Sequence, residues 1–313
     1  MTQYLVTGGA GFIGSHMVHR LVALGHQVRV LDDLSSGRPD RLPRRIDLVV
    51  ADACEPEATL YAARGCSGIF HLAAVASVVK SVEDWVGAHR ANQTATVAVL
   101  DAARRHGNLP VVFASSAAIY GDQCPASEDM KSAPRSAYGA DKAGSELHLQ
   151  AGWLSFGLPS AAMRFFNVFG PRQDPASPYS GVISAFLARV LAGSPLTVHG
   201  DGRQSRDFIF VDDVVRFLQA AMERLHERPA HFVSNVCTGE ATTILRLAEL
   251  AAGMSGRPIR IAHGPERTGD IRHSRGDPRA AISLLGIKAE TPLSVGLDAT
   301  MRWMKSQSLR AAS

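Results

Sequence analysis

Residues Thr7–Gly14 read TGGAGFIG, and this short stretch decides the fold. Its glycines stand three residues apart, at Gly8, Gly11 and Gly14. The stretch directly follows the apolar run Tyr4–Val6 and opens an amphipathic segment over Phe12–Leu24. Glycine lets the backbone turn tightly, lets a pyrophosphate approach the main-chain amides, and lets a helix pack closely on a strand. In this strand–turn–helix setting the pattern predicts a dinucleotide-binding unit.

An acidic residue ends the second predicted strand. Asp32 follows the apolar run Val28–Leu31 and lies 18 residues beyond the last of these glycines. A carboxylate there can accept hydrogen bonds from both adenosine ribose hydroxyls and repels a 2′-phosphate, which favours NAD over NADP. Asp33 and Ser35 beside it also suit a turn or cap, but the glycines favour the cofactor role. Asp52, at the end of the third strand, suits the adenine edge and a helix cap equally well.

Short apolar runs alternate with amphipathic segments through the first half of the chain. The runs lie at Tyr4–Val6, Val28–Leu31, Asp47–Val50, Gly68–Leu72, Pro110–Ala114 and Ser160–Arg164. The clearest helical patterns lie at Phe12–Leu24, Val82–Arg105 and Ala137–Phe156. Strands that alternate with helices predict a parallel sheet covered on both faces, which is a Rossmann-type doubly wound α/β fold.

The regular alternation of apolar runs and helical patterns ends after about residue 165. Loops rich in Gly, Pro, Asp and Arg interrupt short helical patterns at Val182–Leu191 and Thr243–Met254. We therefore expect a smaller mixed α/β lobe that binds the substrate. The predicted division is an NAD-binding domain over residues 1–166 and a substrate lobe over 167–313, with some segments of the second returning to the first.

Composition narrows the class of partner. The 313 residues carry 33 Lys and Arg against 29 Asp and Glu, a net charge of +4, without a dense basic run. This balance favours an anionic small ligand over nucleic acid. Arginines gather loosely at residues 38–45, where Pro39 and Pro43 favour a solvated loop.

Cysteines and hydropathy indicate the compartment. Four scattered cysteines without a CxxC pair argue against a disulfide framework or a metal site, and they favour a reducing cytosol. The first strand begins too early for a signal peptide, and no apolar stretch reaches membrane-spanning length. A cytoplasmic protein that binds no membrane and no metal is the expectation.

A second motif combines a phenol with an ammonium group. Tyr138-Gly-Ala-Asp-Lys142 places Tyr138 and Lys142 four residues apart, on one face of a helix. A tyrosine with a pKa of roughly 10 is a poor base at neutral pH. A lysine cation and the positive nicotinamide ring of NAD would lower that pKa and favour the phenolate.

Taken in order, these motifs resemble the extended short-chain dehydrogenase/reductase family, and within it the UDP-hexose 4-epimerases. The resemblance covers nearly the whole chain. It rests on TGGAGFIG, Asp32, HLAA at 71–74, Asn92, SSAAIYG at 115–121, YGADK at 138–142 and RFFNVFGPRQ at 164–173.

The resemblance implies a role for each matching residue. The catalytic set would be Ser116, Tyr138 and Lys142. Tightly bound NAD would contact Gly8, Gly11, Phe12, Ile13, Asp32, Asp52, Tyr138 and Lys142. The UDP-sugar would contact Ser116, Asn167, Arg206, Arg267, Asp270 and Ser274. Two guanidiniums suit a diphosphate because each offers a planar fork of donors. Family members also pair through two long helices, here Val82–Arg105 and Ala137–Phe156, which implies a homodimer.

The stretch FASSAAIYG at residues 113–121 bears on the reaction. Family dehydratases resemble STDEVYG at this point, with two acids for the proton transfers of elimination. Here those positions hold Ala117 and Ala118, and a methyl group cannot act as an acid or a base. The resemblance thus implies a ketone that survives until hydride returns. The small Ser274, where a tyrosine restricts the N-acetyl pocket in resembling enzymes, implies acceptance of N-acetylated sugars.

Two other functions fit parts of this pattern. A nucleotide-sugar keto-reductase would consume external NADPH, against which Asp32 speaks. A cofactor-binding module without turnover commonly lacks the Tyr or the Lys, whereas this chain retains Tyr138 and Lys142.

Overall fold

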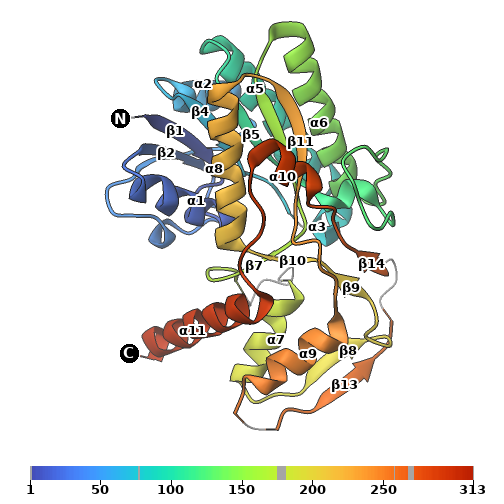
Figure 1. The fold of residues 1–313 in the computed structure, drawn as a ribbon. Coiled ribbons are helices and arrows are strands. Elements are labelled where there is room, and N and C mark those ends of the chain that lie inside the picture. Colours follow the sequence, from blue (N-terminus) through green and yellow to red (C-terminus); the bar gives the residue numbers. More distant parts are fainter. Residues whose placement is uncertain (1, 77, 175–180, 257, 267–270, 313) are drawn as a thin grey trace.

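Seven parallel strands form the central sheet, in the order β11-β6-β5-β4-β1-β2-β3 (Figure 1). The strands are β1 (Gln3–Thr7), β2 (Gln27–Asp32), β3 (Asp47–Val50), β4 (Gly68–His71), β5 (Val111–Ser116), β6 (Ser160–Phe165) and β11 (His231–Val236). The computed structural model describes residues 2–76, 78–174, 181–256, 258–266 and 271–312. Strand order reverses between β1 and β4, and ligands bind outside the carboxyl ends of strands at such a switch point. The predicted Rossmann-type fold is confirmed.

Helices cover both faces of this sheet. They are α1 (Phe12–Ala23), α2 (Pro56–Ala63), α5 (Ala95–Arg105), α6 (Ala137–Phe156), α8 (Val211–Glu227) and α10 (Arg279–Leu285). In β1, Val6 packs in the core beneath α1 and α8, whereas Leu5 packs in the core beneath α2, α5 and α6. Successive side chains of a strand point to opposite faces, so burial on both sides explains why the runs are continuously apolar.

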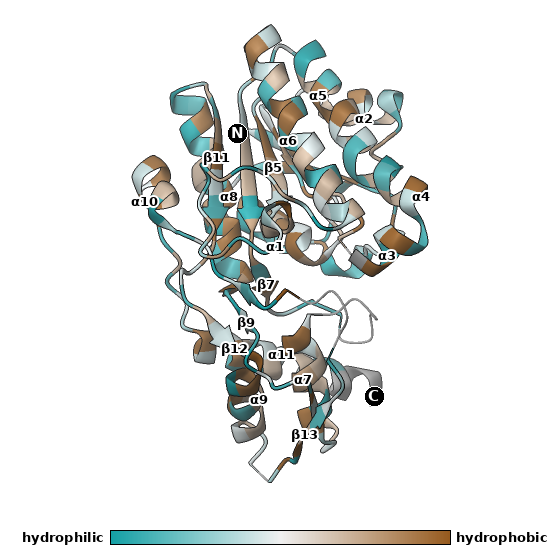
Figure 2. Cartoon of the chain, turned by 90° about the vertical axis from the view of Figure 1, so that its right-hand side faces the viewer, coloured by the Kyte–Doolittle hydropathy of each residue, from teal (hydrophilic) through white to brown (hydrophobic). Residues whose placement is uncertain are grey.

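One predicted helix is wrong in its extent. The segment Val82–Arg105 is divided into the end of α3 (Val78–Glu83), then α4 (Trp85–His89), a π-helical turn η2 (Arg90–Thr94) and α5. Asp84 stands between α3 and α4 in a non-helical conformation, and its carboxylate accepts a hydrogen bond from the Gly87 amide. Asx residues favour such caps, which end one helix and begin the next. Figure 2 shows hydrophobic segments at the surface on α3 and α4.

The smaller lobe lies below the sheet in Figure 1 and has its own core. Its elements are β7 (Asn167–Phe169), α7 (Val182–Leu191), β8 (Leu196–His199), β9 (Ser205–Arg206), β10 (Phe208–Phe210), β12 (Thr242–Thr243), α9 (Ile244–Gly253), β13 (Ile261–Gly264), β14 (His273–Ser274) and α11 (Leu293–Ala312). After β10 the chain returns to the sheet through α8 and β11, and α10 packs against both of them. The division at residue 166 remains a prediction.

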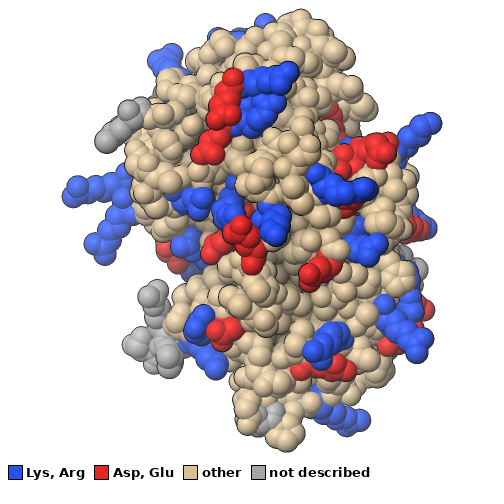
Figure 3. Space-filling model, viewed as in Figure 1, with Lys and Arg blue, Asp and Glu red and all other residues tan. Residues whose placement is uncertain are grey.

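Two surface properties concern the partners. Figure 3 shows basic and acidic side chains interspersed over the face in view, without a field of one sign. Among the described residues, no helix combines the length and the apolar character needed to cross a bilayer.

Candidate active site

The glycine turn between β1 and α1 brings helix and strand unusually close together. Gly8 has a φ of +67°, which favours glycine, and a Cβ there would lie 2.7 Å from the Ala73 amide nitrogen. A Cβ on Gly14 would lie 2.0 Å from the Gly8 carbonyl oxygen. The turn therefore has no space for side chains at these two positions, as a backbone that cradles a pyrophosphate requires.

A cavity of about 570 Å³ opens beside this turn. Its lining includes all six residues that the sequence assigned to the cofactor alone: Gly8, Gly11, Phe12, Ile13, Asp32 and Asp52. Tyr138 and Lys142 are not among the residues that line it. The segment 72–76, which lies against Gly8 of the turn, also lines the cavity, and Asn92 accepts a hydrogen bond from its Val75 amide at 2.8 Å. The main-chain amides of the glycine turn suit a pyrophosphate, and Asp32 at the end of β2 suits a ribose, so the cavity fits an adenine dinucleotide.

Asp32 is buried at the end of β2 and serves the turn as well as the cavity. Its Oδ2 accepts a hydrogen bond from the Ala10 amide, and its Oδ1 accepts one from the Leu34 amide, both at 2.9 Å. Burial raises the pKa of this carboxyl, and the two amides oppose that shift. Each carboxylate oxygen can accept more than one hydrogen bond, so capacity for ribose hydroxyls remains. The turn role and the cofactor role are compatible.

Asp52 does not cap a helix, because α2 begins at Pro56 with Glu55 at its N-cap position, and its contact with the adenine edge remains a prediction. It lines the cavity, and its Oδ1 accepts a hydrogen bond from the Cys54 amide at 2.9 Å. Ligand atoms of Asp52, Cys54 and Glu55 lie within 4.8 Å of one another. The Arg90 guanidinium already donates to the Cys54 sulfur and to Glu55, so this group is arranged as an ion-pair cluster.

Two arginines at the cavity were missed by the sequence reasoning. Arg41 and Arg172 line its edge. The interpretation of residues 38–45 as a solvated loop fits Arg44 and Arg45, which are exposed, and is wrong for Arg41, which is half-buried. Burial lowers the pKa of both cavity arginines, and the charge of Arg41 lowers the pKa of Arg172 further. Only the tertiary contact between distant loops brings them together.

Ser116 and Tyr138 meet at the carboxyl end of β5. The Ser116 hydroxyl accepts a hydrogen bond from the Ala118 amide at 3.1 Å, so it caps the short helix η3 (Ala117–Tyr120). It also hydrogen-bonds the Tyr138 phenol, which lowers the pKa of that group, but burial is the larger effect and raises it. The expectation was that Lys142 and the NAD ring lower this pKa, whereas the protein's own surroundings act in the opposite direction.

Lys142 is buried beneath Tyr138, with only 2% of its surface exposed. Its ammonium donates to the Ala114 carbonyl at 2.7 Å and lies 5.8 Å from the centre of the Tyr138 ring. Burial lowers the pKa of Lys142 to about 7, and the charges of Asp141 and Glu146 limit the fall. Near neutral pH a substantial fraction of this group is therefore uncharged, whereas a surface lysine stays charged.

A buried ion pair between Arg164 and Glu146 supports β5, the strand that carries Ser116. Ser115 faces the opposite side of β5 from Ser116, and its hydroxyl donates to Glu146 at 2.5 Å. Arg164 of β6 donates to both oxygens of Glu146, at 3.0 and 2.7 Å, and to the Tyr120 phenol at 2.8 Å. The sequence reasoning missed Glu146, although its spacing of four from Lys142 places it on the same helical face.

The alanines after Ser116 lie at the site. Ala118 touches the first turn of α6, because a Cβ on Gly139 would lie 2.8 Å from the Ala118 carbonyl oxygen. Gly139 directly follows Tyr138 in the chain. Ala118 is thus next to the residue that carries the phenol.

Three predicted substrate residues gather in the smaller lobe. Ser274 of β14 pairs in register with Arg206 of β9. The main-chain and side-chain amides of Asn167 both donate to the Asp207 carbonyl, at 3.0 and 3.2 Å. β7 begins two residues after the end of β6, and the last residue of β6, Phe165, pairs with Ser116 of β5. Asn167 therefore connects this group with the strand end that carries Ser116. Arg267 and Asp270 lie outside the described residues.

Asp207 organises this group and was missed by the sequence reasoning. Its buried carboxylate accepts hydrogen bonds from the amide and hydroxyl of Thr238 and from the amides of Gly239 and Gly276. These partners come from two loops that no spacing rule connects with residue 207, so no sequence signal could have found them.

The sheet order, the glycine cradle and the Ser116–Tyr138–Lys142 group define an NAD-binding enzyme of the short-chain dehydrogenase/reductase type. Residues 4–237 match the NAD dependent epimerase/dehydratase family, and the chain belongs to that family. The predicted family and the predicted cofactor, NAD, are confirmed.

Relatives match over almost their full length. A UDP-glucose 4-epimerase from Mycolicibacterium smegmatis is 39% identical over 316 residues, spanning 97% of this chain and 99% of the relative. A crystal structure of UDP-glucose 4-epimerase with UDP-glucose from Thermotoga maritima has a TM-score of 0.94 at 34% identity, covering 98% and 100% of the two chains. A UDP-N-acetylglucosamine 4-epimerase from Methanobrevibacter ruminantium, in complex with UDP-N-acetylmuramic acid, has a TM-score of 0.93 at 34% identity, covering 98% and 99%.

The buried ammonium predicts a pH-dependent stability. Between pH 7 and the ordinary lysine value, the unfolded chain holds a proton on Lys142 that the folded chain has released, so stability rises with pH. The free energy of unfolding of the wild type relative to Lys142→Met should increase by at most about 1.4 kcal/mol per pH unit between pH 7.5 and 9.5. Urea unfolding measures this, with Lys131→Met at an exposed lysine as the control. A difference that is flat with pH would show that Lys142 stays charged in the fold.

Proposed function

We propose that the protein inverts C4 of a UDP-hexose through a transient 4-keto sugar. The observation that carries the proposal is the catalytic edge of β5, where Ser116 meets Tyr138 above the buried Lys142 and two alanines follow. The chain's own residues there can move a proton to and from a hydroxyl but offer no acid for elimination.

The cavity lined by Gly8, Gly11 and Asp32 would hold NAD, and the chemistry that NAD would supply there is the removal of a hydride from the sugar carbon and its return. Ser116 aligns the sugar hydroxyl, since its own hydroxyl already contacts the phenol that takes the proton. Tyr138 accepts that proton as a phenolate and gives it back when the alcohol re-forms. Lys142 favours the phenolate when it is charged, and its pKa of about 7 keeps a charged fraction available near neutral pH.

Inversion requires the sugar to turn over while its nucleotide stays in place. Asn167 and Arg206 lie in a small β-structure tied together by Asp207, which suits a fixed diphosphate anchor. Arg267 and Asp270 complete the predicted anchor for the diphosphate and the uridine ribose. We place the enzyme in the cytoplasm, where nucleotide sugars serve polysaccharide synthesis.

A keto-reductase is the alternative that begins with the same residues. It would exchange its cofactor with solution and prefer NADPH, but the buried Asp32 carboxylate at the cofactor cavity disfavours a 2′-phosphate. The epimerase therefore remains the better supported function.

Incubation with UDP-GlcNAc and, separately, with UDP-Glc tests the function without added NAD. We expect the C4 epimer of at least one sugar, with no net change in absorbance at the wavelength of reduced nicotinamide. Tyr138→Phe should lower turnover by roughly 10²–10⁴-fold, the usual contribution of a general base. A 4-keto-6-deoxy product, or a requirement for NADPH, would overturn the proposal.

Ser274 is proposed as the residue that admits an N-acetyl group. It is half-buried opposite Arg206, so a larger side chain there would extend into the substrate lobe. Ser274→Tyr should reduce turnover of UDP-GlcNAc relative to UDP-Glc by about tenfold or more, and Ser274→Ala should leave the ratio unchanged. Equal ratios in all three proteins would exclude a gate at this position.

We propose that two copies pair through α5 and α6. Leu147 and Leu154 lie seven residues apart on α6, with 66% and 75% of their surfaces exposed. Phe156, also on α6, and Val97, on α5, are exposed as well. Side chains spaced by seven share one helical face, so α6 presents an apolar stripe that a second copy would cover. The same helix carries Tyr138 and Lys142.

Leu154→Glu should convert the dimer to a monomer, because each copy would bury an unpaired charge. Light scattering coupled to size-exclusion chromatography measures the mass. Leu284→Glu, at an exposed leucine of α10 on another face, is the control and should leave the mass unchanged. A wild-type monomer at micromolar concentration would refute the pairing.

A further inference from the structure

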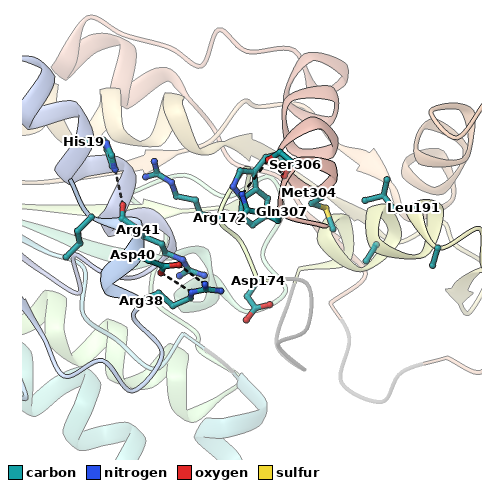
Figure 4. A pocket seen from close by; sticks show the side chains of 14 residues that line it. His19, Arg38, Asp40, Arg41, Arg172, Asp174, Leu191, Met304, Ser306 and Gln307 are labelled. Carbon is teal, nitrogen blue, oxygen red and sulfur yellow. Dashed lines mark hydrogen bonds and ion pairs between the residues drawn. The ribbon is translucent and has the colours of Figure 1, made fainter. Parts of the chain in front are cut away.

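A second cavity, of about 790 Å³, lies beside the cofactor cavity and plays no part in the function proposed above. Its walls come from η1 (Pro39–Arg41), the loop at 172–174, the end of α7, and α11. In Figure 4 the side chains of His19, Arg38, Asp40 and Arg41 lie at one side, Leu191 and Met304 lie at the other, and Arg172 and Gln307 lie between them. The volume is ample for a small metabolite.

Positive charge at this cavity is only partly neutralised. Arg38 forms a two-point ion pair with Asp40, at 3.1 and 2.7 Å. Arg41 and Arg172 have no carboxylate within ion-pair distance among the described residues, although Asp174 also lines the cavity. Among the described residues, the Arg172 guanidinium donates one long hydrogen bond, of 3.3 Å, to the Ser15 hydroxyl.

The charge of Arg41 acts on Arg172. Both guanidiniums are partly buried, and burial followed by the charge of Arg41 lowers the pKa of Arg172, which is the sign of like charges held close together. Burial and the charge of Arg38 lower the pKa of Arg41, and the charges of Asp174, Asp40 and Asp32 oppose that fall. The positive charge of Arg172 also acts on His19. Burial lowers the pKa of His19, and the Arg172 charge adds to that fall. An anion between the two arginines would remove this repulsion and would gain planar, forked donors that match phosphate oxygens.

The opposite wall has a different chemistry. Leu191 of α7 and Trp303 and Met304 of α11 line it, with Ser306 and Gln307 at its polar end. A ligand that fills the cavity would thus place an anionic group at the arginines and an apolar or aromatic part on α7 and α11.

We propose that this cavity binds a small phosphate ester with an apolar or aromatic portion, as a site separate from those of the cofactor and the sugar nucleotide. The two cavities share only Arg41, Arg172 and Asp174. The shared guanidiniums would face one anion in each cavity. Binding of the phosphate ester should therefore weaken the hold on the dinucleotide, and the dinucleotide should weaken the phosphate ester reciprocally.

Titration calorimetry on the holoenzyme tests the site, with NAD and UDP saturating so that AMP cannot enter either established site. We expect a single further site for AMP and for inorganic pyrophosphate, and none for adenosine, which lacks the charge. Binding of adenosine as strong as that of AMP, or no binding of either anion, would overturn the proposal.

Matched variants locate the site. Arg41→Gln should weaken AMP binding about tenfold or more, and Arg44→Gln, at an exposed arginine of the same loop that does not line the cavity, should not. Ala192→Glu at the exposed end of α7 should weaken it through charge repulsion, and the equally large Ala192→Gln should not. Binding that is insensitive to both Arg41→Gln and Ala192→Glu would place the anion elsewhere.

The shared arginines are tested by the release of NAD. AMP should speed the loss of NAD during gel filtration of the wild type and of Ala192→Gln, but not of Ala192→Glu. AMP binding without any effect on NAD release would show that the two cavities do not share their guanidiniums.

Discussion

The contact of Gly14 with the Gly8 carbonyl oxygen is the constraint on which the nucleotide half of the molecule depends. Neither position has room for a Cβ, so the short turn at residues 8–11 brings α1 close to β1, and Gly8 lies against the segment that follows β4. That geometry opens a cavity at the carboxyl ends of the strands, where the order of the sheet reverses. Asp32 contributes to the same arrangement, because its carboxylate holds the turn through the Ala10 amide while it lines the cavity.

Burial determines the pKa of Lys142, which lies near the carboxyl end of β5. Lys142 is buried beneath Tyr138 without a carboxylate in direct contact, and its pKa falls to about 7 as a result. The Glu146–Arg164 pair lies behind it, where it binds Ser115 and holds β5, β6 and α6 in one arrangement. Successive side chains of β5 point to opposite faces, so Ser115 contacts Glu146 whereas Ser116 contacts Tyr138.

The smaller lobe depends on a different kind of connection. Asp207 binds three separate backbone segments and so holds together the strands that carry Asn167, Arg206 and Ser274. Arg41 and Arg172, from loops 131 residues apart, meet where this lobe approaches the sheet, and they separate two cavities. The proposed anion site at this junction depends on tertiary packing, because η1 carries Arg41 and the loop at 172–174 carries Arg172, and neither segment makes the site alone.

The sequence by itself determined the fold class and six of the seven strands of the sheet. It also determined α1, α6 and, within a longer predicted helix, α5, together with the residues proposed to act at the carboxyl end of β5. These features follow from local rules: glycine at a tight turn, alternation of apolar runs, and a spacing of four on a helix. Prediction from the sequence failed where contacts between distant segments determine the structure. Examples are the helix break near Asp84, the hydrogen bonds of Asp207, and the half-buried Arg41, whose loop was expected to be solvated. Only the tertiary structure decided the pKa of Lys142 and the closeness of the Arg41 charge to Arg172, because burial and charge proximity depend on contacts between residues far apart in the chain.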